Sequence, residues 1–147
     1  MIKRTHLQAH LVAAVLALGS GLAVAQNSAT LSPKIAPSGI AYVTGGVGDA
    51  RQQAMKDAMK DYNLRLTFAQ EQSGAYLANV KVTLDHLAEG KGSTQLLDTT
   101  SSGPMLFVKL PAGKYQLRAV TDGQVQARTV NIGQAQAQDL VLHFPAK

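Results

Sequence analysis

Residues 106–119 constrain the fold most strongly, because apolar and polar residues alternate there on both sides of a short turn. The alternating apolar positions are Leu106, Val108, Leu110, Tyr115, Leu117 and Ala119. Every second side chain of a strand points to the same face, so this period of two predicts two half-buried β-strands. Pro111 and Gly113 lie between them and are typical of a turn. The segment therefore predicts an antiparallel hairpin.

Further short segments show the same alternation. The expected strands cover residues 40–43, 64–69, 80–85, 94–99, 105–110, 115–119, 125–132 and 140–144. Asp122 and Gly123 have the composition of a two-residue type I′ turn. About seven short strands at intervals of about ten residues, separated by turn residues, are typical of an antiparallel β-sandwich. We therefore expect a mainly β fold, an immunoglobulin-like antiparallel sandwich with one N-terminal α-helix.

One segment, residues 49–62, has a helical pattern instead. Its apolar residues recur at helical spacing and are Ala50, Ala54, Met55, Ala58, Met59 and Tyr62. Asp49 is an N-cap residue type, and Gln52 three positions later completes a capping-box arrangement. The helix precedes the strands instead of alternating with them, which argues against a parallel βαβ sheet. We expect it to lie across one sheet face or at one end of the sandwich, with its Ala/Met stripe inward.

The first residues have the organisation of a cleavable signal peptide. Lys3 and Arg4 precede an apolar run over residues 11–18, and Ala23-Val24-Ala25 fits the small-x-small cleavage rule. The run is much shorter than the roughly 20 residues of a membrane span. We therefore predict a signal peptide over residues 1–25, a flexible Ser/Pro-rich spacer over 26–40 and a sandwich domain over 41–147. The mature protein is expected in the periplasm or outside the cell, without membrane insertion.

Charge and cysteine content narrow the function classes. The formal net charge of +5 would fall by two on loss of Lys3 and Arg4 with the leader, and the remaining charges are spread singly. Nucleic-acid binding requires a clustered basic surface, so no nucleic-acid partner is expected. The sequence has no cysteine, so stability is expected to come from the core and the strand ladders.

Several motifs occur together in the order of a known domain. They are Val80-x-Val82-x-Leu84, Leu106-x-Val108-x-Leu110-Pro111-x-Gly113-x-Tyr115-x-Leu117-x-Ala119, Val130-x-Ile132-Gly133 and Leu140-x-Leu142. Over residues 63–144 the chain resembles the carboxypeptidase regulatory-like domain of exported bacterial proteins. The resemblance implies a small transthyretin-like β-sandwich that acts as a non-catalytic module for folding, binding or surface display. The helix over 49–62 and the turn over 101–104 depart from the family pattern.

The resemblance transfers no catalytic residue, because the motif residues belong to turns and the core. Related adhesin domains form Lys–Asn isopeptide bonds beside a buried acid, and Lys81 and Asn131 are the conceivable partners here. Lys81 falls on the polar phase of its strand, which favours a solvated lysine.

Metal and phosphate sites have weak support in the sequence. Met55 and Met59 lie one helical turn apart and, with His86 or His143, are candidates for a soft metal. The same spacing suits core packing, which we favour, and His143 is expected to face solvent. Residues 45–48 are glycine-rich but lack the Lys-Ser/Thr pair of a phosphate loop, which favours a simple strand-to-helix connection.

Hydrolytic chemistry has no recognisable motif. Ser101 and Ser102 lie in a turn, and Asp85, His86 and Asp98 are the only conceivable partners. Nothing resembles a nucleophile elbow, so no enzyme activity, catalytic residue or cofactor is predicted.

Residues 124–138 contain five glutamines and one charged residue, Arg128. Such a strand is typical of a poorly protected sheet edge. A partner strand could add to this edge, although an ordinary solvated edge is the simpler interpretation.

These observations together predict a non-catalytic exported module that binds a protein or a glycan, or assists assembly, in the bacterial envelope. The alternative is a periplasmic metal-binding or small-ligand-binding protein. The oligomeric state stays open.

Overall fold

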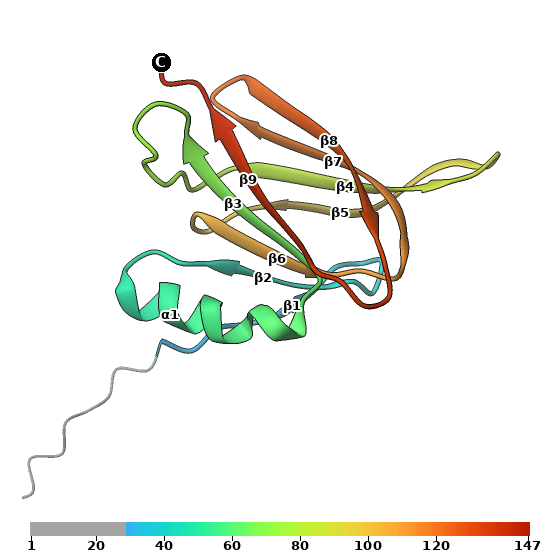
Figure 1. The fold of residues 1–147 in the computed structure, drawn as a ribbon, viewed down its shortest axis with the longest axis horizontal. Coiled ribbons are helices and arrows are strands. Elements are labelled where there is room, and N and C mark those ends of the chain that lie inside the picture. The colour runs from blue at the N-terminus through green and yellow to red at the C-terminus, as the bar shows by residue number, and fades with distance from the viewer. Residues whose placement is uncertain (1–28) are drawn as a thin grey trace, which may run out of the picture.

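The computed structural model of this chain describes residues 29–147, which form two β-sheets packed face to face with one helix on the outside (Figure 1). The elements are β1 (Lys34–Ile35), β2 (Ala41–Gly45), α1 (Asp49–Ala58), the 3-10 turn η1 (Met59–Asp61), β3 (Leu64–Gln70), β4 (Lys81–Ala88), β5 (Gly92–Thr100), β6 (Met105–Lys109), β7 (Gly113–Thr121), β8 (Gln124–Ile132) and β9 (Gln138–Phe144). The first sheet has the order β1-β2-β6-β3-β9 and the second the order β5-β4-β7-β8. The predicted signal peptide, residues 1–25, lies outside the described residues.

The predicted mainly β sandwich is confirmed, and residues 29–147 contain nine strands in place of about seven. In this described part of the chain six strand pairs are antiparallel, and β3 with β9 is the one parallel pair. The chain leaves β8 in the second sheet and crosses to the edge of the first, where β9 runs in the same direction as β3. In the described residues, no helix is long and apolar enough to span a membrane.

The core fills the space between the sheets, and the alternation seen in the sequence places it there. Its most deeply buried residues are Leu64, Leu66, Phe68, Val80, Val82, Leu84, Leu97, Leu106, Val108, Tyr115, Leu117, Ala119, Leu142 and Phe144. The turn at Pro111 is tied to this core, because the Tyr115 hydroxyl donates a hydrogen bond of 2.6 Å to the Pro111 carbonyl. Burial raises the pKa of Tyr115. Tyr115 therefore stabilises the turn that precedes it in the sequence.

The hairpin between β7 and β8 confirms the predicted type I′ turn. Asp122 and Gly123 have φ values of 50° and 77°, and this turn requires a positive φ at both central residues. Asp122 adopts a conformation that most side chains avoid, which is why a small polar residue followed by glycine is suited to this position.

The later part of the predicted spacer belongs to the folded domain. Lys34–Ile35 pairs with the start of β2, and a tight turn follows in which the Ala36 amide donates to the Ile40 carbonyl at 2.8 Å. Ala36 and Ile40 are both buried against the core. These two isolated apolar residues among Ser and Pro gave no periodic pattern, so the sequence predicted a spacer up to residue 40 and a first strand only over 40–43.

The helix begins at Asp49, as expected, but its cap and its end differ from the expectation over 49–62. Gly48 is the N-cap, Asp49 is the first helical residue, and no side chain caps the helix, so the predicted capping box does not form. The Gln52 amide instead donates to the Gly48 carbonyl at 2.9 Å. The α-helix ends at Ala58 and continues as the short η1 turn.

The helix covers part of the outer face of the first sheet, over β2 and β6 (Figure 1). Met55 is completely buried there, against Val43 of β2 and against Met105 and Phe107 of β6. This second small core explains why both faces of β6 are apolar. Within the predicted apolar stripe Met55 is the fully buried residue, whereas Ala50 is exposed.

Asn63, between η1 and β3, joins three segments of the first sheet. Its side chain donates to the Leu110 carbonyl at 2.7 Å and accepts from the Leu110 amide at 2.8 Å. Its backbone amide donates to the Val108 carbonyl at 3.2 Å, and its carbonyl accepts from the Gln138 amide at 2.8 Å. Asn63 therefore fixes where β3 enters between β6 and β9.

Replacing Asn63 by Ala should lower the free energy of unfolding by about 2 kcal/mol, because it leaves the amide and carbonyl of Leu110 unpaired in a half-buried place. Urea denaturation measures the change. Asn131→Ala, at an exposed position on β8, is the matched control and should change stability by less than about 0.5 kcal/mol. Equal effects of the two substitutions would contradict the assigned role of Asn63.

Met55→Ala should destabilise the protein by about 3 kcal/mol, since it removes a fully buried side chain from the helix–sheet contact. Met59→Ala, one turn later and only partly buried, should cost about 1 kcal/mol. Thermal and urea unfolding of both variants test the prediction. A loss at Met55 no larger than that at Met59 would show that the helix is not held by this contact.

Candidate binding groove

The sulfur and imidazole groups considered for metal binding lie apart. Met55 is buried beneath the helix, whereas Met59 lies at its end beside β9. His86 is on β4, where its ring packs on Tyr115 with centroids 5.2 Å apart, and His143 is exposed on β9 in the other sheet, as expected. Within residues 29–147, no three His, Asp or Glu side chains are grouped as metal ligands.

The residues considered for hydrolysis are also separated. Ser101 is 1% exposed, and its hydroxyl accepts a hydrogen bond of 3.1 Å from the Val80 amide, just before β4 begins. Asp98 lies near the same end and forms a 3.8 Å ion pair with Lys81. His86 is near the opposite end of β4, opposite Thr94. Ser101 therefore has a structural role in joining two strands.

Lys81 and Asn131 are too far apart to form an isopeptide bond. Lys81 pairs with Val120 on β7, and Asn131 pairs with Lys114 on the same strand. These two register positions are six residues apart along β7, which corresponds to ~20 Å. Lys81 also faces solvent, as its polar phase indicates.

The glycine-rich segment before α1 forms a strand-to-helix connection. Gly46 and Gly48 have φ values of 94° and 83°, which favour glycine. A Cβ on Gly46 would lie 3.2 Å from the Met105 sulfur, so the loop passes close against the sheet.

The glutamine-rich segment forms the edge of the second sheet only as far as Ile132, and residues 133–137 are a loop. Two of its glutamines reach across to the first sheet. The side-chain amide of Gln124 donates to the Pro145 carbonyl and that of Gln126 to the His143 carbonyl, both at 3.0 Å. They link the β8 and β9 edges at one end of the sandwich.

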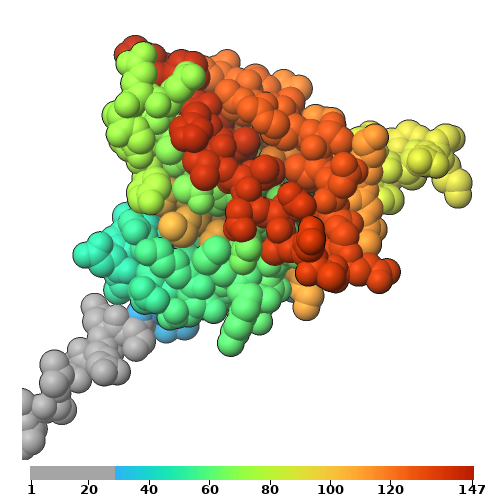
Figure 2. Space-filling model, in the orientation of Figure 1, coloured from blue at the N-terminus to red at the C-terminus, as the bar shows by residue number. Residues whose placement is uncertain are grey.

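A groove lies on the outer face of the first sheet, between the end of α1 and β9. The helix covers β2 and β6 but leaves the outer faces of β3 and β9 open, and Figure 2 shows β9 (red) crossing the surface above the helix (green). The groove has a volume of about 200 Å³. Its lining is mainly apolar and includes Met59, Arg65, Thr67, Phe107, Asp139 and Val141.

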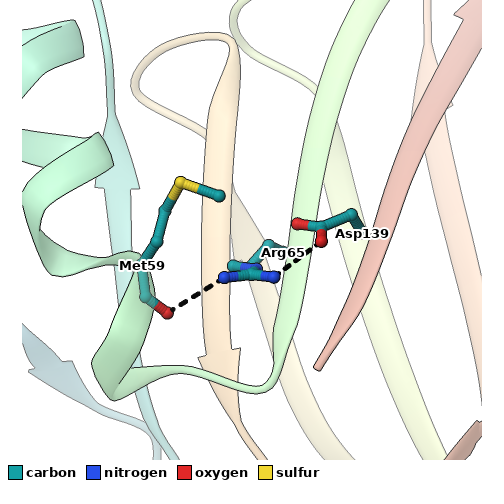
Figure 3. Close-up of polar contacts among 3 residues, drawn as sticks. All are labelled: Met59, Arg65 and Asp139. Atoms are coloured by element: carbon teal, nitrogen blue, oxygen red, sulfur yellow. Dashed lines mark hydrogen bonds and ion pairs between the residues drawn. The ribbon is translucent and has the colours of Figure 1, made fainter. Parts of the chain in front are cut away.

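Arg65 lies in this groove between the helix end and β9 (Figure 3). One guanidinium nitrogen binds the Asp139 carboxylate at 2.6 Å, and the other donates to the Met59 carbonyl at 3.5 Å. The Arg65 Nε atom is buried and has no hydrogen-bond partner in the described residues. A buried donor without a partner costs about 1–3 kcal/mol. A bound group with an oxygen acceptor would remove this cost.

Sequence reasoning did not identify Arg65, because it falls on the polar phase of β3 and belongs to no motif. The side chain is in fact 18% exposed, while its partner Asp139 is 59% exposed. The feature of the sequence that could have indicated this burial is the helix. Its apolar stripe has to pack on a sheet face, so some polar-phase positions of that face must become buried. Which strand lies beside it depends on pairing that the alternation does not reveal.

No known family model matches this chain, and no curated protein sequence matches it either. The groove is thus characterised by its own geometry.

Replacing Arg65 by Met distinguishes a binding role from a structural one. The long apolar side chain keeps the packing and removes the unpaired donor, while the lost ion pair involves a solvent-exposed carboxylate. The free energy of unfolding should therefore stay within about 1 kcal/mol of the wild-type value. A loss of more than about 2 kcal/mol in urea denaturation would show that Arg65 is retained for stability.

Proposed function

We propose that this chain is a non-catalytic module of an exported bacterial protein that binds an extended segment of a partner protein in the groove beside α1. The observation that carries the proposal is the buried, unpaired Nε of Arg65 within a mainly apolar groove. Unsatisfied buried donors are rare in folded proteins and require an explanation. A backbone carbonyl of a bound segment would be a suitable acceptor.

The size of the groove supports a side-chain anchor. Pockets for whole small ligands usually have volumes of ≈ 300–1,000 Å³. The groove, at about 200 Å³, is suited to one or two apolar side chains of a longer segment that continues across the surface. Met59 adds adaptability, because methionine side chains fill irregular gaps.

A protein partner is favoured over a glycan by the nature of the lining. Sugar rings commonly stack on exposed aromatic faces, whereas Phe107, the aromatic residue of the groove, is only 3% exposed. Val141 offers an aliphatic surface that is 55% exposed, which is suited to another aliphatic side chain. Lys56 and Asp139 add one charge of each sign to the lining.

The alternative, a metal carrier, has no observation in its favour among the described residues. Met55 is enclosed by Val43, Met105 and Phe107, so its sulfur takes part in packing. The resemblance to the carboxypeptidase regulatory-like domain and the signal-peptide pattern support an envelope module. The family and the envelope location are therefore parts of this proposal.

Selection from a peptide library on the purified domain tests the function. Peptides enriched on the wild-type domain should bind Thr67→Lys at least tenfold more weakly, because the long side chain fills the groove floor. Thr129→Lys, the same substitution at an exposed position of β8, should bind them as the wild type does. Isothermal titration calorimetry gives the affinities.

Two outcomes would reject the proposal. One is that no peptide is enriched above the background of an unrelated domain. The other is that the enriched peptides bind Thr67→Lys and Thr129→Lys equally well, which would place their site elsewhere on the molecule.

A further inference from the structure

The groove beside α1 contains an oxidisable side chain, Met59. The structure describes three methionines, at positions 55, 59 and 105. Met55 is fully buried and Met105 is 7% exposed, whereas Met59 is only partly buried and lines the groove. A thioether that an oxidant can reach is converted to a polar sulfoxide. Among these three residues, Met59 is the one open to that reaction in the folded protein.

The backbone of Met59 is attached to Arg65, the residue with the unpaired donor. The Arg65 guanidinium donates to the Met59 carbonyl at 3.5 Å, and both side chains line the same cavity of about 200 Å³ (Figure 3). Methionine has three rotatable side-chain bonds, which allow its sulfur to adjust within so small a space. An oxygen placed on the Met59 sulfur is therefore confined to the surroundings of the guanidinium.

The Nε atom of Arg65 is the donor that such an oxygen would satisfy. The two terminal nitrogens already bind the Asp139 carboxylate and the Met59 carbonyl. Nε is buried and has no hydrogen-bond partner in the described residues. The sulfur of an unmodified methionine is only a weak acceptor. A sulfoxide oxygen carries much of the charge of its polar S–O bond, so it is a strong one.

We propose that Met59 is a site of reversible oxidation, and that its sulfoxide oxygen accepts a hydrogen bond from the Arg65 Nε and closes the groove to the partner segment. The oxidant class is a peroxide. The thioether sulfur attacks one oxygen of hydrogen peroxide, the O–O bond breaks, and the second oxygen leaves as water with both hydrogens. The sulfur is oxidised by two electrons and the peroxide is reduced by two. Methionine sulfoxide reductases reverse the change.

Oxidation would change the groove in two ways. It occupies the donor that the proposed function assigns to a carbonyl of the bound segment, and it adds a polar oxygen to a mainly apolar lining. Closure of the groove rests on the proposed function, whereas the oxidation of Met59 and its bond to Arg65 do not.

Peptide mapping by mass spectrometry after limited treatment with hydrogen peroxide tests the selectivity. In the folded protein Met59 should be oxidised at least about tenfold faster than Met55 or Met105, because reaction at the two buried residues requires local opening. In protein unfolded in urea the three rates should become equal. Oxidation of Met59 no faster than that of Met105 in the folded protein would overturn the proposal.

Urea unfolding of protein oxidised at Met59 alone tests the hydrogen bond. In the wild type the bond to Arg65 offsets the cost of a polar group in the groove, whereas Arg65→Met offers no donor. Oxidation should therefore raise the equilibrium constant of unfolding about tenfold more in Arg65→Met than in the wild type, as expected for one hydrogen bond to a charged group. Equal effects of oxidation on the two proteins would overturn the proposal.

Isothermal titration calorimetry with the library-selected peptides tests the closure. Oxidised wild-type protein should bind them at least about tenfold more weakly, because its donor is already paired. Met59→Leu is the matched control, since leucine has a similar volume and forms no sulfoxide, and peroxide should leave its affinity unchanged. Treatment of the oxidised wild type with methionine sulfoxide reductase should restore binding.

These outcomes separate the inference from the proposed function. If the unoxidised protein enriches no peptide, the proposed function fails and the closure fails with it, while the first two measurements still decide whether Met59 is an oxidation site bonded to Arg65. If peptides bind oxidised and unoxidised protein equally well, the proposed function stands and the inference is rejected.

Discussion

The four hydrogen bonds of Asn63 determine how the first sheet is assembled. They attach the start of β3 to the end of β6, to Leu110 and to the start of β9, so that strands distant in the sequence meet in one register. With β3 held between β6 and β9, its inner face completes the core and its outer face carries Arg65 beside the end of the helix. Both the core and the groove depend on this junction.

The groove exists because the helix is narrower than the sheet that it covers. An α-helix with its side chains is ≈ 10–12 Å wide, and neighbouring strands are ≈ 4.8 Å apart, so one helix covers about two strands. The helix is centred on β2 and β6 through Met55, which leaves β3 and β9 uncovered on that side. The open face therefore follows from the same contact that docks the helix.

Local pattern was sufficient to predict the hairpin around Asp122 and Gly123, the buried alternation in residues 106–119 and the existence of the helix. These features depend on neighbours in the sequence. The parallel pairing of β9 with β3, the burial of Arg65 and the inclusion of residues 34–40 depend on which strands become neighbours in space. Alternation shows which side chains share a face, but it does not identify the strand that lies alongside.

The position of β9, after all other strands in the sequence, affects when the first sheet can be completed. Its partner β3 lies far earlier in the sequence, with Arg65 and Asp139 separated by 74 positions. Leu142 and Phe144 complete the core only when this strand has been inserted, so a chain shorter than about residue 144 lacks one side of its first sheet. Closing so long a loop is slow. The first sheet and its side of the core are therefore completed by one of the last segments of this sequence to be synthesised.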